Sequence, residues 1–236
     1  MYKRQVHPTK AGLKIPEIFD SAINKEVKAV WIIGEDIVQT DPNSQHVIDA
    51  MNSLELLVVQ EIFMSETAKL ATVVLPGTTF LEKDGTFTNT ERRIQRVNKA
   101  VEPLPGTKPD GVIVTDMMQK LGFNQPDYNA DEVLAEIADV VPFFKGVTRE
   151  RLGKLGLQWP VQEDGTDTQI LHKETFKLGK GRLKNFDFKE STEIETNQKD
   201  YPLILTTSRV LQHYNAATMT RRTSNCLLYT SPSPRD

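Results

Sequence analysis

The stretch WIIGEDIVQTDP at residues 31–42 places groups that could bind a ligand at the end of an apolar run. Gly34 would let the backbone approach a ligand closely, because glycine has no side chain in the way. The carboxylates of Glu35 and Asp36 can accept paired hydrogen bonds from an amidine-like edge such as that of guanine, or from ribose hydroxyls. Thr40 adds a hydroxyl. We therefore expect these residues to bind such a group.

A second interpretation of the same stretch needs no ligand. Asp36 and Thr40 would only cap a turn, and Asp41-Pro42 would start the next helix, since these residue types are common in turns. From the residues alone, both interpretations stay open.

Helical and strand patterns alternate around this stretch. Apolar spacing predicts helices over residues 15–25, 43–54 and 65–70 and strands over 29–33, 56–59 and 72–75. This alternation predicts an α/β fold with a doubly wound, Rossmann-like parallel sheet, whose first strand would be buried on both faces. In such sheets ligands bind beyond the carboxyl ends of the strands. Those ends are here Gly34-Glu35-Asp36, Gln60-Glu61 and Pro76-Gly77.

The chain after the third strand predicts a polar hairpin and two packing helices. Asp84-Gly85 signals a tight turn between Phe80-Leu81 and Thr86-Phe87. Helices are predicted over residues 112–121 and 131–140. No Gly-x-Gly-x-x-Gly motif is present, which argues against an ordinary nicotinamide site.

Beyond residue 142 the periodicity is poor until a new strand is predicted at residues 201–207. We therefore expect a segment that connects two domains. Within it, Trp159 is expected to anchor packing and His172 to lie at the surface.

Composition limits the class of protein. The net charge of −3 provides no basic field for a phosphate backbone, so we expect no nucleic-acid partner. No apolar run reaches the length of a membrane span, and no secretory signal is evident, so a cytoplasmic location is expected. The single cysteine, Cys226, leaves neither an internal disulfide framework nor a multi-cysteine metal site within this sequence.

Both ends of the sequence resemble translated sequencing adapter. CLLYTSPSPRD at residues 226–236 can be back-translated into a transposase-end adapter, and YKRQ at residues 2–5 can be written as its inverted copy. A disordered Ser/Pro tail is the alternative, but it does not explain the inverted relation. We therefore expect residues 1–5 and 226–236 to be adapter-derived and the remainder to be an internal piece of a longer protein.

Four motifs in order carry a family resemblance. They are GEDIVQTDP at residues 34–42, FMSETAKLATVVLP at 63–76, EKDGTFTNTERRIQR at 82–96 and HYNAATMTRR at 213–222. Together they resemble the formate dehydrogenase alpha subunits of the molybdopterin oxidoreductase superfamily. The resemblance extends over most of the sequence, and four ordered motifs are far more specific than one.

The resemblance implies two molybdopterin guanine dinucleotides that hold molybdenum or tungsten, and the oxidation of formate to CO2 or its reverse. It implies contacts to the guanosine part or other parts of the cofactor from Asp36, Thr40, Gln60, Gly77, Asp110, Arg209, His213 and Asn215, beside the Gly34-Glu35 turn. The metal-ligating Cys or selenocysteine and the cysteines of a 4Fe-4S cluster would precede this sequence. We therefore assign no catalytic residue and no metal ligand here, and expect this piece alone to be inactive.

The resemblance also implies a division into domains. Residues 6–140 would be the C-terminal part of the molybdopterin oxidoreductase domain, 141–199 a connecting segment, and 200–225 the start of a dinucleotide-binding β-barrel. Electron-acceptor subunits are implied as partners, with NAD-linked, ferredoxin-linked and hydrogenase-linked forms all open. Two alternatives remain: another molybdopterin oxidoreductase such as a nitrate reductase, or the non-catalytic large iron–sulfur subunit of a respiratory complex.

Overall fold

The computed structural model describes residues 9–189, 202–203, 211 and 213–223. The chain divides into two compact units, with the boundary between Gln169 and Ile170. The expected adapter-derived ends and Arg209 lie outside the described residues, as does most of the strand expected at residues 201–207. The truncated β-barrel is therefore not tested by the structure.

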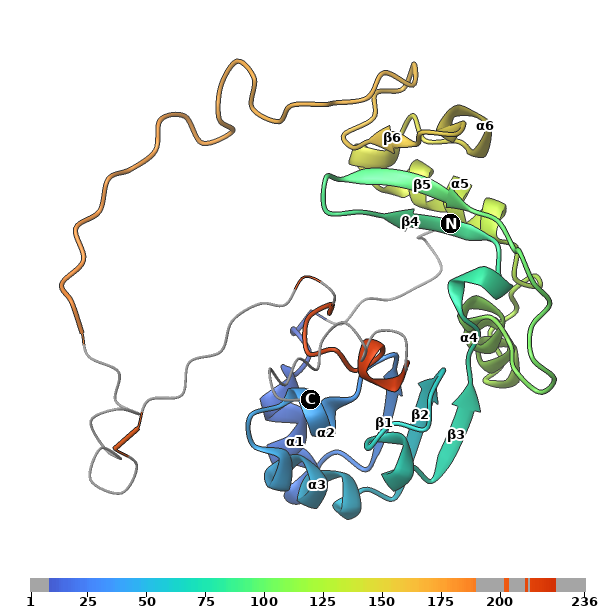
Figure 1. Ribbon diagram of the computed structural model, residues 1–236, viewed down its shortest axis with the longest axis vertical. Coiled ribbons are helices and arrows are strands. Elements are labelled where there is room, and N and C mark those ends of the chain that lie inside the picture. The colour runs from blue at the N-terminus through green and yellow to red at the C-terminus, as the bar shows by residue number, and fades with distance from the viewer. Residues whose placement is uncertain (1–8, 190–201, 204–210, 212, 224–236) are drawn as a thin grey trace, which may run out of the picture. The chain divides into compact units, whose positions relative to one another are not determined.

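A three-stranded parallel sheet carries the first part of the chain (Figure 1). Its strands are β1 (Ala29–Ile33), β2 (Leu56–Glu61) and β3 (Val73–Pro76), adjacent in that order. Helical segments lie before and between them: α1 (Ile15–Ile23), α2 (Ile37–Thr40), α3 (Ser44–Ser53) and the 3-10 turn η2 (Ala68–Leu70). The predicted α/β class and the parallel strands are thus confirmed.

The sequence explains where these elements begin. Pro16 stands in the first turn of α1, where its missing N–H is not needed. The Asn43 side chain caps α3 by accepting a hydrogen bond from the His46 N–H at 3.3 Å. Gly34 ends β1 with φ +64°, a conformation that disfavours other residues.

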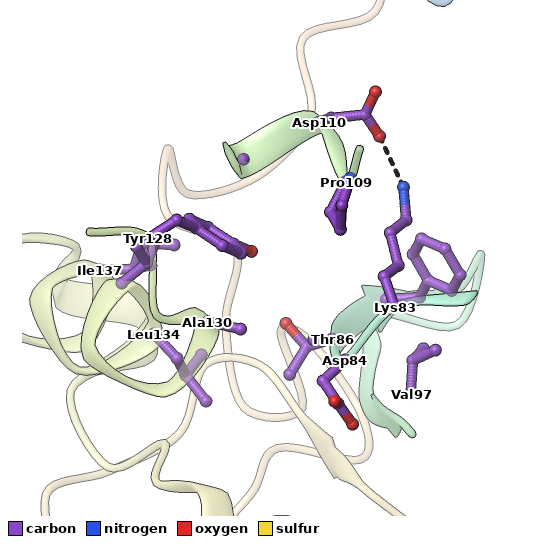
Figure 2. Close-up of a pocket in the computed structure, with 14 residues that line it drawn as sticks. Lys83, Asp84, Thr86, Val97, Pro109, Asp110, Tyr128, Ala130, Leu134 and Ile137 are labelled. Atoms are coloured by element: carbon purple, nitrogen blue, oxygen red, sulfur yellow. Dashed lines mark hydrogen bonds and ion pairs between the residues drawn. The ribbon is translucent and has the colours of Figure 1, made fainter. Parts of the chain in front are cut away.

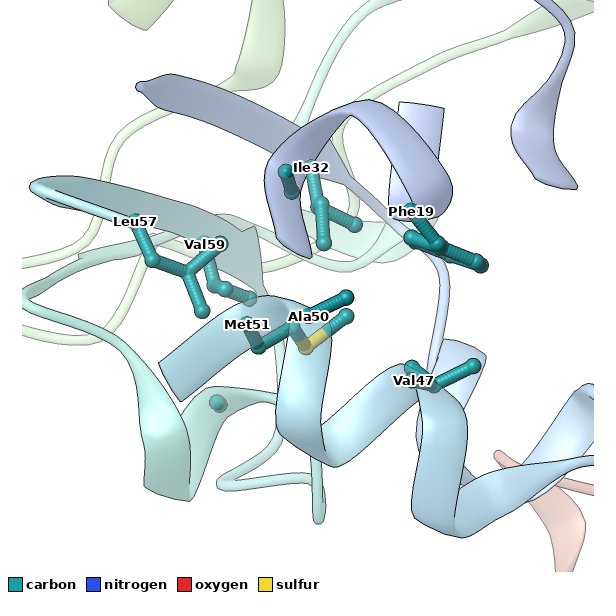
Figure 3. Packing of buried hydrophobic residues seen from close by; sticks show 9 residues of the cluster. Phe19, Ile32, Val47, Ala50, Met51, Leu57 and Val59 are labelled. Atoms are coloured by element: carbon teal, nitrogen blue, oxygen red, sulfur yellow. The ribbon is translucent and has the colours of Figure 1, made fainter. Parts of the chain in front are cut away.

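The core of this layer lies between α1, α3 and one face of the sheet (Figure 3). Phe19 comes from α1, while Val47, Ala50 and Met51 come from α3. They pack on the alternate strand residues Ile32, Leu57 and Val59, all less than a tenth exposed. This period-two pattern follows from the alternation of side chains along a strand.

The opposite face of the sheet is only partly covered by the described residues. Ile33 is 49% exposed, Leu56 40% and Val73 42%, so the expectation that the first strand is buried on both faces is wrong for this chain. The physical reason is the strand order. Successive right-handed crossovers that all move in one direction place their helices on one side of the sheet.

A second, antiparallel sheet contains β4 (Gly85–Thr88), β5 (Arg93–Val97) and β6 (Leu157–Gln158), in that order. The turn between β4 and β5 lies at residues 89–92 rather than at Asp84-Gly85, where a strand begins instead. The Asn89 side chain explains the difference, because its oxygen accepts from the N–H groups of Glu91 and Arg93 at 3.1 and 2.9 Å. Such a side-chain turn competes well with an Asp-Gly turn.

The remaining helical segments of the first unit are α4 (Asp110–Lys120), α5 (Ala130–Val140) and α6 (Arg149–Leu152), with 3-10 turns η3 (Phe80–Glu82) and η4 (Pro142–Phe144). A small core joins Ile94 of β5 to Leu134 of α5 and to Val147, Leu152 and Val161. Part of the segment expected to connect domains therefore packs into the first unit, up to Gln169.

Trp159 packs as expected. Its ring lies 5.8 Å from that of Phe143, and the Arg92 guanidinium lies 5.7 Å from its centroid. Residues 173–189 are exposed, and His172 is exposed too, with its ring 5.5 Å from that of Phe176.

Among the helices that the structure describes, none is long and apolar enough to cross a membrane.

In the second unit the described residues 213–223 form a compact turn that includes the 3-10 segment η5 (Thr220–Arg222). The His213 Nδ1 lies 2.5 Å from the Thr220 hydroxyl. Ala217 is 4% exposed, and within the turn its N–H donates to the Tyr214 carbonyl oxygen at 2.9 Å while its own carbonyl oxygen accepts from the Arg221 N–H at 3.0 Å.

Candidate functional site

The carboxyl ends of the three parallel strands lie side by side. The register pairs Ile33 with Gln60, and the Gly34 N–H donates to the Gln60 carbonyl oxygen at 2.9 Å. On the other side of β2, the Gly77 N–H donates to the Glu61 carbonyl oxygen at 3.0 Å. The structure thus brings together Gly34, Gln60 and Gly77, which lie far apart in the sequence. We call this group of strand ends the strand-end edge.

Asp36 is buried next to this edge, with 2% of its surface exposed. Its Oδ1 accepts two hydrogen bonds from Thr67, one from the backbone N–H at 3.0 Å and one from the hydroxyl at 2.8 Å. The Thr67 hydroxyl also accepts from the Val38 N–H at 3.1 Å. Asp36 makes no side-chain capping bond to α2, so its carboxylate ties two loops together rather than capping a turn.

Glu35 and Thr40 lie at the surface beside it. The Thr40 hydroxyl donates to Glu35 Oε1 at 2.7 Å, and both residues are exposed. Gly34 is exposed as well, and a Cβ added there would meet no atom within 4 Å. The GED turn therefore leaves open space beside an exposed hydroxyl–carboxylate pair, which a ligand could reach.

The other side of the edge is a chain of side-chain contacts from β2 to α4. Gln60 is 1% exposed, and its Nε2 donates to Asp110 Oδ1 at 2.8 Å. Lys83 Nζ donates to Asp110 Oδ2 at 2.6 Å, which makes an ion pair that Figure 2 shows. We call Lys83, Asp110 and Gln60 the amide triad.

The charge on Asp110 follows from these contacts. Burial by itself raises the pKa of this carboxyl. The hydrogen bonds from Lys83 and Gln60, together with the positive charge of Lys83, more than offset burial, so the pKa lies below its usual value. Asp110 is therefore ionised at neutral pH and can only accept hydrogen bonds.

Gly77 leaves little room beside the amide triad. A Cβ added to Gly77 would lie 3.1 Å from Asp110 Oδ1 and 3.7 Å from a methyl of Ile62. Because Gly77 has no side chain, the Asp110 carboxylate can approach the strand-end edge. Gly77 therefore contributes to the site by lacking a side chain as well as through its backbone.

Some buried side-chain atoms have no hydrogen-bond partner among the described residues. They are Gln60 Oε1, the Thr78 hydroxyl and the Trp31 indole N–H. Leaving a buried polar group unsatisfied costs about 1–3 kcal/mol. A ligand that offered a hydrogen-bond donor or acceptor to such an atom would remove this cost and so bind more tightly.

Lys83 is held in place by the segment around it. Glu82 accepts hydrogen bonds from the Thr79 N–H and hydroxyl, each at 2.8 Å, and from the Leu104 N–H at 3.0 Å. The bond from the Thr79 backbone is the main reason why the pKa of Glu82 is lowered. The EKDGT motif is therefore anchored through its glutamate, and its lysine projects toward Asp110.

A cavity of about 230 Å3 is lined in part by the Lys83–Asp110 pair (Figure 2). Its lining combines this ion pair with apolar side chains of α5 and the Tyr128 ring. Burial raises the pKa of the Tyr128 hydroxyl, and the charges of Asp110 and Asp131 raise it further. A Cβ on Gly111 would lie 2.2 Å from this ring, so the cavity wall depends on a glycine.

The remaining predicted residues belong to the second unit. His213 is half-buried and bonded to Thr220, while Asn215 is exposed with φ +48°. Arg209 lies outside the described residues. Their part in a common site with the strand-end edge stays a prediction.

Sequence reasoning missed Thr67 and the role of Lys83. Thr67 lies in the SETAK stretch, 31 residues from Asp36, and only the crossover from β2 to β3 brings it there. Lys83 stands in the conspicuous EKDGT stretch, but its partner Asp110 lies 27 residues away. Within the described ranges, no group of three or more His, Cys, Asp or Glu side chains could hold a metal ion.

Comparison with known proteins defines the class. The molybdopterin oxidoreductase family matches residues 3–120, and the chain belongs to this family. This confirms the expectation drawn from the four ordered motifs.

Particular relatives carry a narrower name. The chain is 44% identical over 227 residues to the F420-dependent formate dehydrogenase subunit alpha of Methanocaldococcus jannaschii, covering 95% of this chain and 33% of that protein. It is 45% identical over 216 residues to the F420-dependent formate dehydrogenase 2 subunit alpha of Methanococcus maripaludis, covering 89% of this chain and 32% of that protein. The chain thus spans about a third of the length of these relatives.

A solved structure shares the fold. Acetylene hydratase from Pelobacter acetylenicus matches with a TM-score of 0.58 and 21% sequence identity, over 84% of this chain and 30% of that one. At this identity the likeness supports the fold alone.

Proposed function

We propose that this chain is a cofactor-binding part of a formate dehydrogenase alpha subunit. The whole protein would oxidise formate to CO2, or catalyse the reverse reaction, and pass two electrons to a partner subunit. The similarity to relatives named formate dehydrogenase, which extends over 89–95% of this chain, supports the proposal. A cytoplasmic location, a 4Fe-4S cluster and a doubly wound sheet completed by other parts of the protein belong to the same proposal.

The chain's own part would be to hold the guanosine portion of one molybdopterin guanine dinucleotide at the strand-end edge. The observation that carries this is the buried Gln60 Oε1, which accepts no hydrogen bond from the described residues. Guanine and ribose both offer N–H or O–H donors that would satisfy such an acceptor. Strand ends of parallel sheets are also where α/β proteins bind nucleotides.

The donor set fits a nucleotide. Gly34 leaves open space at the turn, and the exposed Glu35 carboxylate could accept from ribose hydroxyls. Thr67 fixes Asp36 so that this turn keeps its shape. When bound, the cofactor would supply two-electron redox chemistry at its metal, molybdenum or tungsten, while these residues bind and orient its nucleotide.

The test needs the full-length protein, because the chain spans about a third of its relatives. The protein would be purified without oxygen and assayed for formate-dependent viologen reduction, for molybdenum and tungsten, and for GMP released on acid treatment. We expect turnover with formate and about two GMP per metal ion, as the bis-dinucleotide form requires. Coenzyme F420, the acceptor in the relatives' names, and NAD would be compared as physiological acceptors.

Two outcomes would contradict the proposal. Nitrate-dependent oxidation of reduced viologen without formate activity would indicate the nitrate reductase-like alternative. A stably folded protein with iron but neither molybdenum nor tungsten would indicate a non-catalytic iron–sulfur subunit.

A further inference from the structure

The two ends of the Gln60 side-chain amide have different environments. Nε2 donates to Asp110 Oδ1 at 2.8 Å, whereas Oε1 is buried and has no donor among the described residues. A glutamine amide can turn by 180° and exchange its donor end for its acceptor end. What a ligand meets at this place therefore depends on which orientation is stable.

Asp110 decides the orientation only while it is ionised. An ionised carboxylate accepts hydrogen bonds but donates none, so the NH2 end of Gln60 must face it. The turned amide would place Oε1 against Oδ1, two acceptors without a proton between them. A neutral partner such as Asn could donate to Oε1, and both orientations would then be possible.

Lys83 fixes the position of this carboxylate, whose side chain is 40% exposed and could otherwise turn away from Gln60. Its Nζ lies 2.6 Å from Oδ2, the oxygen that Gln60 does not use, and its side chain is only 24% exposed. Lys83 thus bonds to one carboxylate oxygen of Asp110, and Gln60 bonds to the other.

We propose that Lys83, acting through Asp110, is a positioning residue that holds the Gln60 amide with its oxygen available to a nucleotide donor. This inference rests on the proposed function. It adds that the oriented Gln60 amide sets which nucleotide edge the site accepts. The edge presents an acceptor, so it selects a base or sugar edge that carries N–H or O–H donors and disfavours one that carries only acceptors.

The competing explanation is that Lys83 merely ties the EKDGT segment to α4. Such a tether would affect the stability of the fold, but not the orientation of one amide. The amide mechanism makes the effects of Lys83 and Gln60 dependent on each other, which a tether does not.

The experiment uses the full-length protein and measures GMP bound per protein and the rate at which the nucleotide is lost after dilution. Lys83→Met should lose the nucleotide about tenfold faster than wild type, as expected for one hydrogen bond. Lys83→Arg keeps the cation and should restore retention. Lys99→Met is the matched control, because the Lys99 ammonium pairs with Glu102 rather than with Asp110; it should retain the nucleotide like wild type.

Asp110→Asn provides a second variant of nearly unchanged shape, which should also lose the nucleotide faster because it permits both amide orientations. In a Gln60→Leu background, which removes the acceptor, Lys83→Met should cause no further loss. Normal retention in Lys83→Met, failure of Lys83→Arg to rescue, or a full further loss on top of Gln60→Leu would each overturn the inference. A wild-type protein without any guanine nucleotide would instead refute the proposed function.

Discussion

Thr67 donates two hydrogen bonds to one oxygen of Asp36, from its backbone N–H at 3.0 Å and its hydroxyl at 2.8 Å. The two residues belong to turns that follow different strands, and both are at most 2% exposed. This contact fixes the loop after β1 against the loop after β2. It also means that any role of Asp36 in ligand binding must be separated from its role in holding these loops.

Two substitutions can separate these roles. Asp36→Ala would leave the buried Thr67 N–H and hydroxyl without this acceptor, and should destabilise the fold by about 2–4 kcal/mol. Thr67→Val removes only the hydroxyl and keeps the carboxylate, so it should cost about 1–2 kcal/mol. Thermal unfolding would measure both, with Thr107→Val as a control at an exposed hydroxyl.

Cofactor content then tests the binding role. If Asp36 binds the nucleotide, Asp36→Ala should lower molybdenum and GMP in the full-length protein more than Thr67→Val does. Equal content in an intact Asp36→Ala protein would mean that Asp36 only holds the loops together.

The lowered pKa of Asp110 predicts a dependence of stability on pH. A carboxyl whose pKa is lower in the folded than in the unfolded state stabilises the fold above the unfolded value of about 3.9. This contribution is lost as the pH falls through the folded pKa. The difference in Tm between wild type and Asp110→Asn should therefore be constant near neutral pH and shrink below about pH 4.

Lys83→Met should change this profile. Without the lysine the folded-state pKa of Asp110 rises toward the unfolded value, so Asp110 should lose less stability on acidification than in wild type, and this loss should be complete at a higher pH. Melting curves collected between neutral and acidic pH would measure it. A profile identical to that of wild type would show that Lys83 does not set the charge of Asp110.

Local patterns in the sequence predicted an element well where an apolar run ends at a residue that favours a turn or a helix cap. β1 spans the predicted residues 29–33, because a short apolar run ends at a glycine that adopts a positive φ. The start of α5 follows from the Asn129 cap. Long-range contacts were beyond such patterns: Gln60 and Asp110 are 50 residues apart, and nothing local indicates that an amide and a carboxylate will meet. The partial exposure of the other sheet face was also missed, because an apolar run does not say how many of its faces this chain covers.

Gly77 offers a test of how closely Asp110 must approach. A methyl group there would lie 3.1 Å from Asp110 Oδ1, which is tight, so the carboxylate must shift by a few tenths of an ångström. We expect Gly77→Ala to lower the free energy of unfolding by about 1 kcal/mol. Gly12→Ala is the matched control, because a Cβ at Gly12 meets nothing within 4 Å. Equal stability of both variants would mean that Asp110 adapts freely.

Arg92, in the NTERR stretch, makes several contacts that stabilise the fold, and their contribution can be measured. Its backbone adopts φ +67°, and its guanidinium donates to the carbonyl oxygens of Thr168 and Gln169, each at 3.0 Å, and to that of Trp159. It also lies over the Trp159 ring. These contacts tie the β4–β5 turn to the last residues of the first unit.

We therefore expect Arg92→Lys to destabilise this unit, because an ammonium cannot replace the several fixed donors of a guanidinium. The loss should be about 1–3 kcal/mol in thermal unfolding. Limited proteolysis should cut the segment at residues 159–169 faster than in wild type, since its carbonyl partners are released. Arg96→Lys is the control, because the Arg96 guanidinium donates to nearby Asn98 at an exposed position. A cleavage rate equal in both variants would show that the segment is held by β6 and Trp159 without Arg92.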